Sequence, residues 1–219
     1  MYLLAAVLRH NITQATIDFM PKGGLVRMAT AAWLLGLTVA FGSENVEERP
    51  NILLITIDTL RADHLSSYGY PLKTSPAIDH LAEEGVRFSS TYSTIPLTGP
   101  SHISLFTSRF PQEHGARVNG YAVDKDSKWL FLPQILKRFG YTNAAFISAW
   151  PLTSRLTHLD RWFDVYDEDL KRNSQVFNSS RYAEDVTPLV THWLSNRLET
   201  PFFLWVHYFD PHSPYHLRD

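Results

Sequence analysis

The sequence predicts an α/β fold, with a mostly parallel β-sheet and helices on both of its faces. Three short apolar segments of strand length occur at 52–57, 142–149 and 202–206. Segments with helical periodicity separate them, so that strands and helices alternate along the chain. This alternation is typical of a parallel sheet whose strands are connected by helices.

The first predicted strand is Ile52–Ile57, an apolar run that is rich in β-branched residues. A run of this kind suits a parallel strand that is buried on both faces. A helix is then predicted from Ser75-Pro76 to Gly85, because the apolar residues between them share one face and glycine commonly ends a helix. Val86–Phe88 predicts the beginning of a further strand.

The segment Thr94–Gly115 predicts a loop that leads into a helix, with Thr98 at or just before the first helical turn. Pro96 and Gly99-Pro100 interrupt its first part, and a short apolar pattern follows. Proline is tolerated in a first turn, where the amide that it lacks would have no partner. The positive end of a helix and its backbone amides suit an anion. The simpler interpretation is that Thr98 is an ordinary N-cap.

The second half of the chain repeats the alternation. Leu132–Phe139 predicts a short amphipathic helix that ends at Gly140, and Thr142–Ala149 predicts the next strand. Residues 151–180 have no regular pattern. A longer helix is then predicted to end near Leu198, and the last strand, 202–206, follows it. These elements complete the α/β pattern.

The composition excludes several classes of function. The chain has 219 residues, of which 44% are hydrophobic and 19% charged, as in globular proteins. Its formal charge of -2 gives no basic footprint for nucleic acid. It has no cysteine, which excludes disulfides, thiolate metal sites and cysteine nucleophiles.

The N-terminal region divides into three parts before the folded part, 51–219. Residues 1–19 have no assigned role. Residues 20–42 combine a short positive region with an apolar run shorter than the roughly 20 residues of a membrane span, which predicts a signal peptide. Residues 43–50 predict a polar linker. We therefore expect a secreted or periplasmic protein, or a membrane-anchored one if the apolar run is not cleaved.

Polar side chains follow the predicted strands at three places. Asp58 ends the first strand, Thr98 and His102 lie at the start of a predicted helix, and His207 and His212 follow the last strand. Ligands in α/β sheets bind beyond the carboxyl ends of the strands, so these side chains are expected to converge. Asp58 and the hydroxyl of Thr98 are candidate ligands for one divalent metal, Ca²⁺ or Mg²⁺, with Mn²⁺ or Zn²⁺ as alternatives. The alternative for Asp58 is a helix N-cap.

At this point the sequence resembles a known family. The motifs are RPNILLITIDTLRADHLSSYGY from Arg49, then SPAIDHLAEEGVRF, the Thr98 segment with FPQEHG, and PFFLWVHYFDPHSPY. In order and spacing they are similar to the N-terminal part of a sulfatase of the alkaline phosphatase superfamily. The resemblance implies an alkaline phosphatase-like fold. It also implies that further metal ligands lie downstream, so that the sequence is expected to be a truncated N-terminal part of the catalytic domain.

The resemblance also implies roles for individual residues. Asp58 matches the first metal-ligand aspartate, and Thr98 stands at the nucleophile position of the C/S-x-P-S-R motif, which here reads T-G-P-S-H. His212 resembles the histidine that contacts the sulfate, and His207 is a second candidate for substrate binding. Asn119 is a further candidate donor to the substrate.

The departures from the family pattern change the expected chemistry. A threonine at position 98 and the lack of cysteine mean that formylglycine is not expected. His102 replaces the motif's arginine, and Thr59 replaces the second aspartate of the usual pair. A metal held by Asp58 could still stabilise the Thr98 alkoxide, backbone amides could bind the equatorial oxygens, and His102 or His212 could protonate the leaving oxygen.

Three functions remain open on these observations. The first is hydrolysis of a small-molecule or glycan sulfate ester by Thr98 and a divalent metal. The second is hydrolysis or transfer at phosphorus, by a phosphodiesterase, phosphonate hydrolase or phosphoryl transferase, which an unmodified threonine nucleophile favours. The third is an inactive fragment or pseudoenzyme that acts as a binding module, because a tight metal site needs several ligands.

Overall fold

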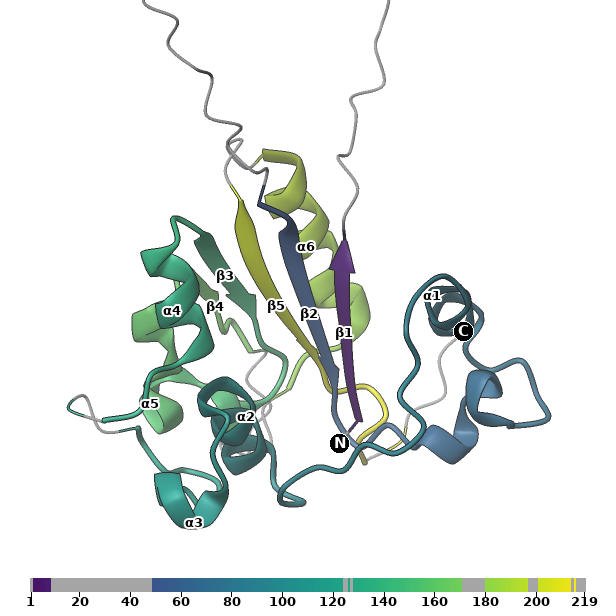
Figure 1. Ribbon diagram of the computed structural model, residues 1–219, viewed down its shortest axis with the longest axis horizontal. Coiled ribbons are helices and arrows are strands. Elements are labelled where there is room, and N and C mark those ends of the chain that lie inside the picture. Colours follow the sequence, from purple (N-terminus) through teal and green to yellow (C-terminus); the bar gives the residue numbers. More distant parts are fainter. Residues whose placement is uncertain are drawn as a thin grey trace, which may run out of the picture.

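A computed structural model describes residues 2–8, 49–123, 126, 128–170, 180–196, 201–213 and 215. The predicted signal peptide, 20–42, and all of the linker except residues 49 and 50 lie outside these residues. Figure 1 shows a central sheet with helices packed on it. Within the described part of the chain, no helix has the length and apolar character needed to cross a membrane.

The sheet has five strands in the order β1-β2-β5-β3-β4. Their bounds are Tyr2–Leu8, Asn51–Ile57, Thr142–Phe146, Val165–Asp167 and Phe202–Tyr208 for β1 to β5. Only β1 is antiparallel to its neighbour, and β2, β5, β3 and β4 are parallel. The predicted mostly parallel sheet is therefore confirmed, and the parallel strands end together at its lower edge in Figure 1.

Within the described residues, six α-helices and four short 3-10 turns accompany the strands. The helices are α1 Pro76–Glu84, α2 Thr98–Thr107, α3 Pro111–His114, α4 Leu132–Arg138, α5 Ser154–Thr157 and α6 Ala183–Asn196. The 3-10 turns are Ala62–His64, Ser66–Tyr68, Trp150–Leu152 and Leu159–Trp162. The predicted helices beginning near Ser75, Thr98 and Leu132 are confirmed.

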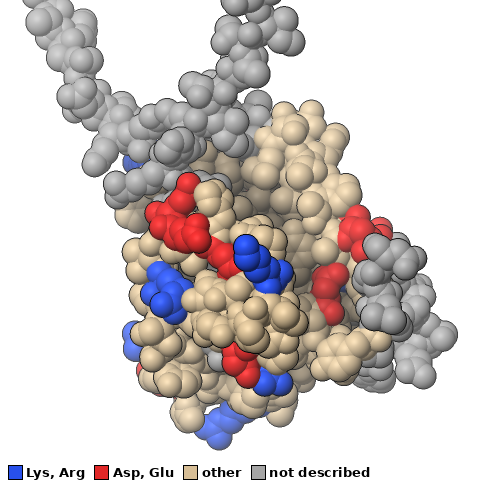
Figure 2. Space-filling view, turned by 90° about the vertical axis from the view of Figure 1, so that its right-hand side faces the viewer, with Lys and Arg blue, Asp and Glu red and all other residues tan. Residues whose placement is uncertain are grey.

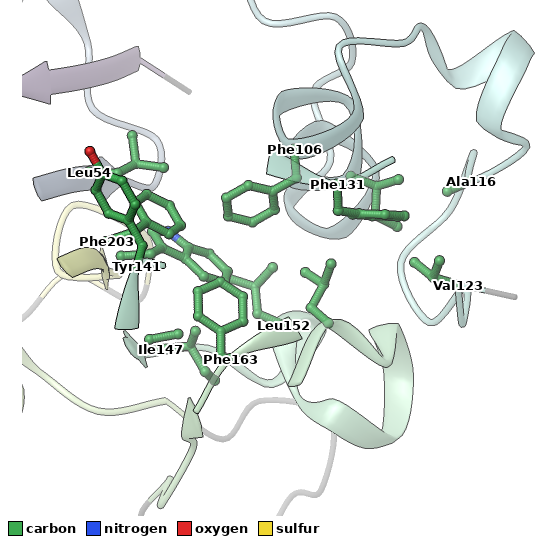
Figure 3. Close-up of a cluster of buried hydrophobic side chains, with 14 residues drawn as sticks. Leu54, Phe106, Ala116, Val123, Phe131, Tyr141, Ile147, Leu152, Phe163 and Phe203 are labelled. Carbon is green, nitrogen blue, oxygen red and sulfur yellow. The ribbon is translucent and has the colours of Figure 1, made fainter. Parts of the chain in front are cut away.

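Two hydrophobic clusters show that helices cover both faces of the sheet. On one face, Val186 and Val190 of α6 pack against Leu204 and Val206 of β5. On the other face, the cluster in Figure 3 joins Phe106 of α2 to Phe163 and to residues of the strands. The indole of Trp205 lies at its centre and is completely buried. Strand β5 is buried on both faces because it lies between these two layers.

Several local predictions differ from the structure. Val86–Phe88 is not a strand, because no strand lies beside it within the described residues and both apolar side chains are exposed. Strand β3 ends at Phe146, earlier than predicted. The irregular region 151–180 contains the short strand β4. Residues 2–8, for which the sequence indicated no role, form β1. Strand β2 is fully buried only at Leu54 and Thr56, and its other residues are partly exposed, including Leu53, which packs against the cluster that contains α6.

Candidate active site

The candidate site lies where β2 and β5 end and α2 begins. The two strands pair in parallel register, with Thr56 opposite His207. The amide of Asp58 continues this pairing by donating to the carbonyl of Tyr208 at 2.9 Å. The next residue, Thr59, has a φ of 52°, a left-handed conformation that β-branched residues rarely adopt. The backbone therefore turns sharply here, and Asp58 remains at the end of its strand.

Asp58 and Thr98 are in direct contact, although 40 positions separate them. The hydroxyl of Thr98 donates to Oδ2 of Asp58 at 2.8 Å. Asp58 is buried, and burial alone would raise the pKa of its carboxyl group. The neighbouring His207 and the hydrogen bond from Thr98 outweigh burial and lower this pKa to about 2. Asp58 is therefore an ionised carboxylate that holds the proposed nucleophile.

The backbone of Thr98 is held by three further side chains. Its carbonyl accepts a hydrogen bond from Ser101 Oγ at 2.9 Å and one from His102 Nδ1 at 2.7 Å. The amide of Gly99 donates to Oδ1 of Asn119 at 2.9 Å. The side-chain oxygen of Asn119 therefore holds the start of α2. Asn119 would donate to the substrate, as the sequence predicts, through its Nδ2 group.

The expected anion site on the amides of α2 is smaller than the sequence suggested. The amide of Gly99 is taken by Asn119, and that of Ser101 donates to the carbonyl of Leu97 at 3.0 Å. Pro100 has no amide hydrogen. These three residues therefore offer no amide to a bound anion, because each is either paired or lacks the group.

His102 is completely buried, and both of its ring nitrogens are engaged. Besides its bond to Thr98, its Nε2 lies 3.0 Å from the hydroxyl of Thr56. Burial, together with the neighbouring His207, lowers the pKa of His102 to about 3. The ring is therefore neutral near pH 7 and has no free nitrogen to protonate a leaving group. This geometry suits a residue that positions Thr98, and does not suit the acid expected from the sequence.

His207 lies behind Asp58 and is also completely buried. Its Nδ1 accepts a hydrogen bond from the amide of Ser148 at 3.4 Å, so in the neutral ring the proton is on Nε2. That Nε2 is 3.7 Å from Oδ2 of Asp58 and has no hydrogen-bond partner among the described residues. The placement suits orientation of Asp58 better than contact with a substrate.

His212 lies beyond the end of β5, on the turn that follows the strand. Its ring stacks on that of Phe209, with centroids 4.2 Å apart, and its Nδ1 is 2.6 Å from the carbonyl of Ser213. Among the described residues, the structure shows no hydrogen bond or ion pair between His212 and either Asp58 or Thr98. His212 is partly exposed, unlike His102 and His207, so it is accessible to a substrate.

The donors at this site fit part of a metal site. Asp58 and Thr98 supply a carboxylate and a hydroxyl oxygen 2.8 Å apart, and hard cations prefer oxygen ligands. The described residues contain no group of three or more His, Cys, Asp or Glu side chains that could hold a metal ion. Asp58 and Thr98 therefore fit a divalent cation as two ligands of an incomplete set.

A separate cavity of about 280 Å³ borders α2 at Ile103. It is lined by Ile103, His114, Tyr121, Val123, Asp126, Lys128, Trp129 and Phe131, and by none of the site residues. His114 is held there by Ser104 at 2.8 Å and by the amide of Ala116 at 3.1 Å.

On the face shown in Figure 2, basic and acidic side chains are interspersed, so this face does not carry charge of one sign alone.

Sequence reasoning missed Thr56, Ser148 and Trp205. Thr56 contacts both His102 and Trp205, and Ser148 contacts His207. The only signal for Thr56 is a hydroxyl within an otherwise apolar strand. Ser148 and Trp205 carry no motif, because their role depends on which strands are neighbours.

Comparisons with known proteins identify the family. A family model described as Sulfatase matches residues 50–219. The chain is 31% identical over 186 residues to an N-acetylglucosamine-6-O-sulfatase of Bacteroides thetaiotaomicron, covering 78% of this chain and 33% of that protein. It is 32% identical over 173 residues to the N-acetylgalactosamine-6-sulfatase of Homo sapiens, covering 66% of this chain and 33% of that protein. The chain thus spans about a third of the length of these relatives.

Solved structures agree with this assignment. The structure of BT4656 in complex with its substrate D-glucosamine-2-N,6-O-disulfate is 28% identical, with a TM-score of 0.63, and the match covers 76% of this chain and 35% of that one. The phosphonate monoester hydrolase of Agrobacterium radiobacter shares the fold at 21% identity, with a TM-score of 0.59, covering 76% of this chain and 42% of that one. The chain therefore belongs to the sulfatase family and has the fold of the alkaline phosphatase superfamily.

Proposed function

We propose that this protein is a metal-dependent hydrolase of sulfate esters that uses Thr98 as its nucleophile. The observation that carries the proposal is the contact between the Thr98 hydroxyl and the ionised Asp58 carboxylate at 2.8 Å. It places a hydroxyl beside a buried negative charge at the carboxyl end of a parallel sheet, where such folds bind ligands. Family membership supports ester hydrolysis.

In the proposed reaction, Thr98 Oγ1 attacks the sulfur of the ester. A bond forms between Oγ1 and sulfur, and the bond between sulfur and the alcohol oxygen breaks. The proton of the Thr98 hydroxyl passes to solvent, and the leaving oxygen takes a proton from His212 and departs as the alcohol. Water then attacks the sulfur of the threonine sulfate, which releases inorganic sulfate and restores the Thr98 hydroxyl.

Asp58 and Thr98 are the residues of this chain that would hold the divalent cation. When bound, the cation would stabilise negative charge on the threonine oxygen and on the ester oxygens. Until then, Asp58 accepts the hydroxyl proton of Thr98 in a hydrogen bond. The positive end of α2 begins at Thr98 and favours the anionic ester group.

His212 is the proposed proton donor to the leaving oxygen. It is partly exposed, and an imidazolium ring can donate a proton to a leaving oxygen. His102 is assigned to positioning, because both of its nitrogens are engaged and its pKa is about 3. His207 is assigned to the orientation of Asp58, and the Nδ2 group of Asn119 is a proposed donor to the substrate.

The proposed substrate is the sulfate ester of a sugar. BT4656, which is 28% identical, was solved with a glucosamine disulfate as its substrate. The sequence indicates export by the 20–42 signal peptide, which agrees with a substrate outside the cell. The second candidate is a phosphate or phosphonate ester, which the unmodified threonine at position 98 favours.

Paired substrates test the proposal. Aryl sulfate and aryl phosphodiester hydrolysis would be measured for this protein with and without Ca²⁺, Mg²⁺, Mn²⁺ or Zn²⁺. Thr98→Ala should abolish metal-dependent sulfate release, and Thr98→Ser should retain part of it. Preference for the phosphodiester would favour the second candidate. Equal activity in all three proteins would refute the role of Thr98, and no turnover in any of them would favour a binding module.

A further inference from the structure

A chain of buried hydrogen bonds runs from the centre of the sheet to the backbone of Thr98. Nε1 of Trp205 is 3.0 Å from Oγ1 of Thr56. The same oxygen is 3.0 Å from Nε2 of His102, and Nδ1 of His102 is 2.7 Å from the carbonyl oxygen of Thr98. Trp205, Thr56 and His102 are each 0% exposed, so no solvent competes for these bonds.

The chemistry at both ends fixes the direction of the chain. An indole nitrogen only donates and a carbonyl oxygen only accepts. Nδ1 of His102 must therefore carry the proton that reaches Thr98. The oxygen of Thr56 accepts from Trp205, and its own proton needs an acceptor, which is the lone pair on Nε2 of His102. All of these donors and acceptors are satisfied in one tautomer, the neutral ring with its proton on Nδ1.

The hydroxyl of Thr56 is the donor that satisfies Nε2 of His102 in this tautomer. Without it, Nε2 of His102 would be a buried acceptor with no donor, which is unfavourable. Moving the proton to Nε2 would give no partner, so the ring could recover one only by rotating. Rotation would remove the 2.7 Å bond to Thr98, because that bond needs a protonated Nδ1 beside the carbonyl.

Thr98 is the residue whose orientation depends on this bond. Its carbonyl is held by His102, and its hydroxyl donates to Asp58 at 2.8 Å. The neighbouring rings of Trp205 and His207 lie 5.3 Å and 5.2 Å from the His102 ring, so the imidazole is enclosed on both sides. A change in its hydrogen bonds is therefore transmitted to Thr98 and cannot be absorbed by solvent.

We propose that Thr56 is a positioning residue for Thr98, because its hydroxyl holds the His102 ring in the orientation that donates to Thr98. The functional part rests on the proposed role of Thr98 as nucleophile. The structural part, which is the dependence of the His102 ring on Thr56, does not require turnover.

Three variants test the structural part. Thr56→Val removes the hydroxyl and keeps the β-branched shape, and Thr56→Ser keeps the hydroxyl. Thr107→Val is the matched control, since Thr107 is a buried threonine of the same helix as Thr98 and donates to the carbonyl of Ile103 at 2.7 Å. Thr56→Ala replaces Thr56→Val if the latter does not fold.

The readout is the ring nitrogen spectrum of isotope-labelled histidine at one fixed pH, with the His102 signals assigned by their loss in His102→Gln. The unsubstituted protein should show a neutral ring with its proton on Nδ1. Thr56→Val should shift or mix these signals, Thr56→Ser should restore them, and Thr107→Val should leave them unchanged. An unaltered His102 spectrum in Thr56→Val would overturn the proposal.

Steady-state hydrolysis tests the link to Thr98. In Thr56→Val, kcat should fall by about tenfold or more with KM nearly unchanged, as expected for a misplaced nucleophile. Thr56→Ser should retain most of kcat. A changed His102 spectrum with an unchanged kcat would refute the link. If the unsubstituted protein shows no turnover, the proposed function fails while the spectrum still decides the structural part.

Discussion

At the scale of single residues, the site depends on a few buried polar groups whose partners fix their charge. Asp58 is ionised because His207 and Thr98 outweigh its burial. His102 is neutral because it is buried and already paired. One negative charge therefore faces the Thr98 hydroxyl.

Asp58→Ala should abolish stabilisation by a divalent cation. The substitution removes the carboxylate that we propose as a ligand, and the Thr98 hydroxyl alone binds a cation weakly. Thermal unfolding of both proteins, with and without Ca²⁺ or Mg²⁺, measures the effect. Asp63→Ala is the control, because Asp63 is an exposed carboxylate. A metal-dependent shift that persists in Asp58→Ala would remove this residue from the site.

Acid should destabilise the protein through His102 before it affects Asp58. The pKa of His102 is about 3 in the folded chain against 6.5 in a free side chain, so between these values the unfolded state binds a proton that the folded state does not. The free energy of unfolding therefore falls as pH falls below 6.5. The slope is at most about 1.4 kcal/mol per pH unit for this one residue.

Asp58 adds to this loss at lower pH. Its pKa is about 2 in the folded chain against 3.8 in the free side chain, so its contribution is present above 3.8 and is lost as pH falls towards 2. Urea unfolding between pH 7 and pH 4 separates the histidines from Asp58, and His114, whose pKa is also lowered by burial, adds to the same slope. His102→Gln should flatten the slope there, and His80→Gln, at an exposed position, should not. Equal slopes in the two variants would contradict the assignment.

At the scale of secondary structure, the carboxyl ends of neighbouring strands are tied together by buried side chains. Arg181, just before α6, donates from Nε to the carbonyl of Ile147 at 2.9 Å and forms an ion pair with Asp167 at the end of β4. Its Nη2 also donates to the carbonyl of Asp167 at 3.0 Å. The side chain is 2% exposed, so its removal leaves several polar groups without a partner.

Arg181→Met should lower the free energy of unfolding by about 3 kcal/mol or more, because it leaves a partly buried carboxylate unpaired. The control is Lys137→Met, which breaks the exposed pair between Lys137 and Asp164 and should cost less than about 1 kcal/mol. Urea unfolding measures both values. Similar losses of unfolding free energy in the two variants would show that the buried ion pair stabilises the fold no more than the exposed one does.

The elements themselves were predictable to different degrees. The strands β2, β3 and β5 and the helices α1, α2 and α4 follow from local patterns of apolar residues, because each buries a continuous face. Strand β4 was missed, since its three residues, Val165–Asp167, owe their conformation to pairing with β3. Val86–Phe88 was wrong for the opposite reason, because a strand-like sequence forms a strand only beside another strand.

At the scale of the whole molecule, parallel topology is what brings the site together. The order β1-β2-β5-β3-β4 places β2 beside β5, so Asp58 and His207 become neighbours although nearly the whole folded part of the chain separates them. The convergence of strand ends was predictable from the α/β pattern. The burial of His102 and His207 was not, because it depends on how closely α2 packs over β2 and β5.

The measurement that tests the central claim most directly is detection of a covalent intermediate on Thr98. The protein would be mixed with a sulfate ester labelled on the sulfate group, quenched in acid and mapped by peptide mass spectrometry. The account predicts label on the peptide that contains Thr98, and none in Thr98→Ala. Metal-dependent turnover with no label on Thr98, or turnover that survives Thr98→Ala, would contradict it.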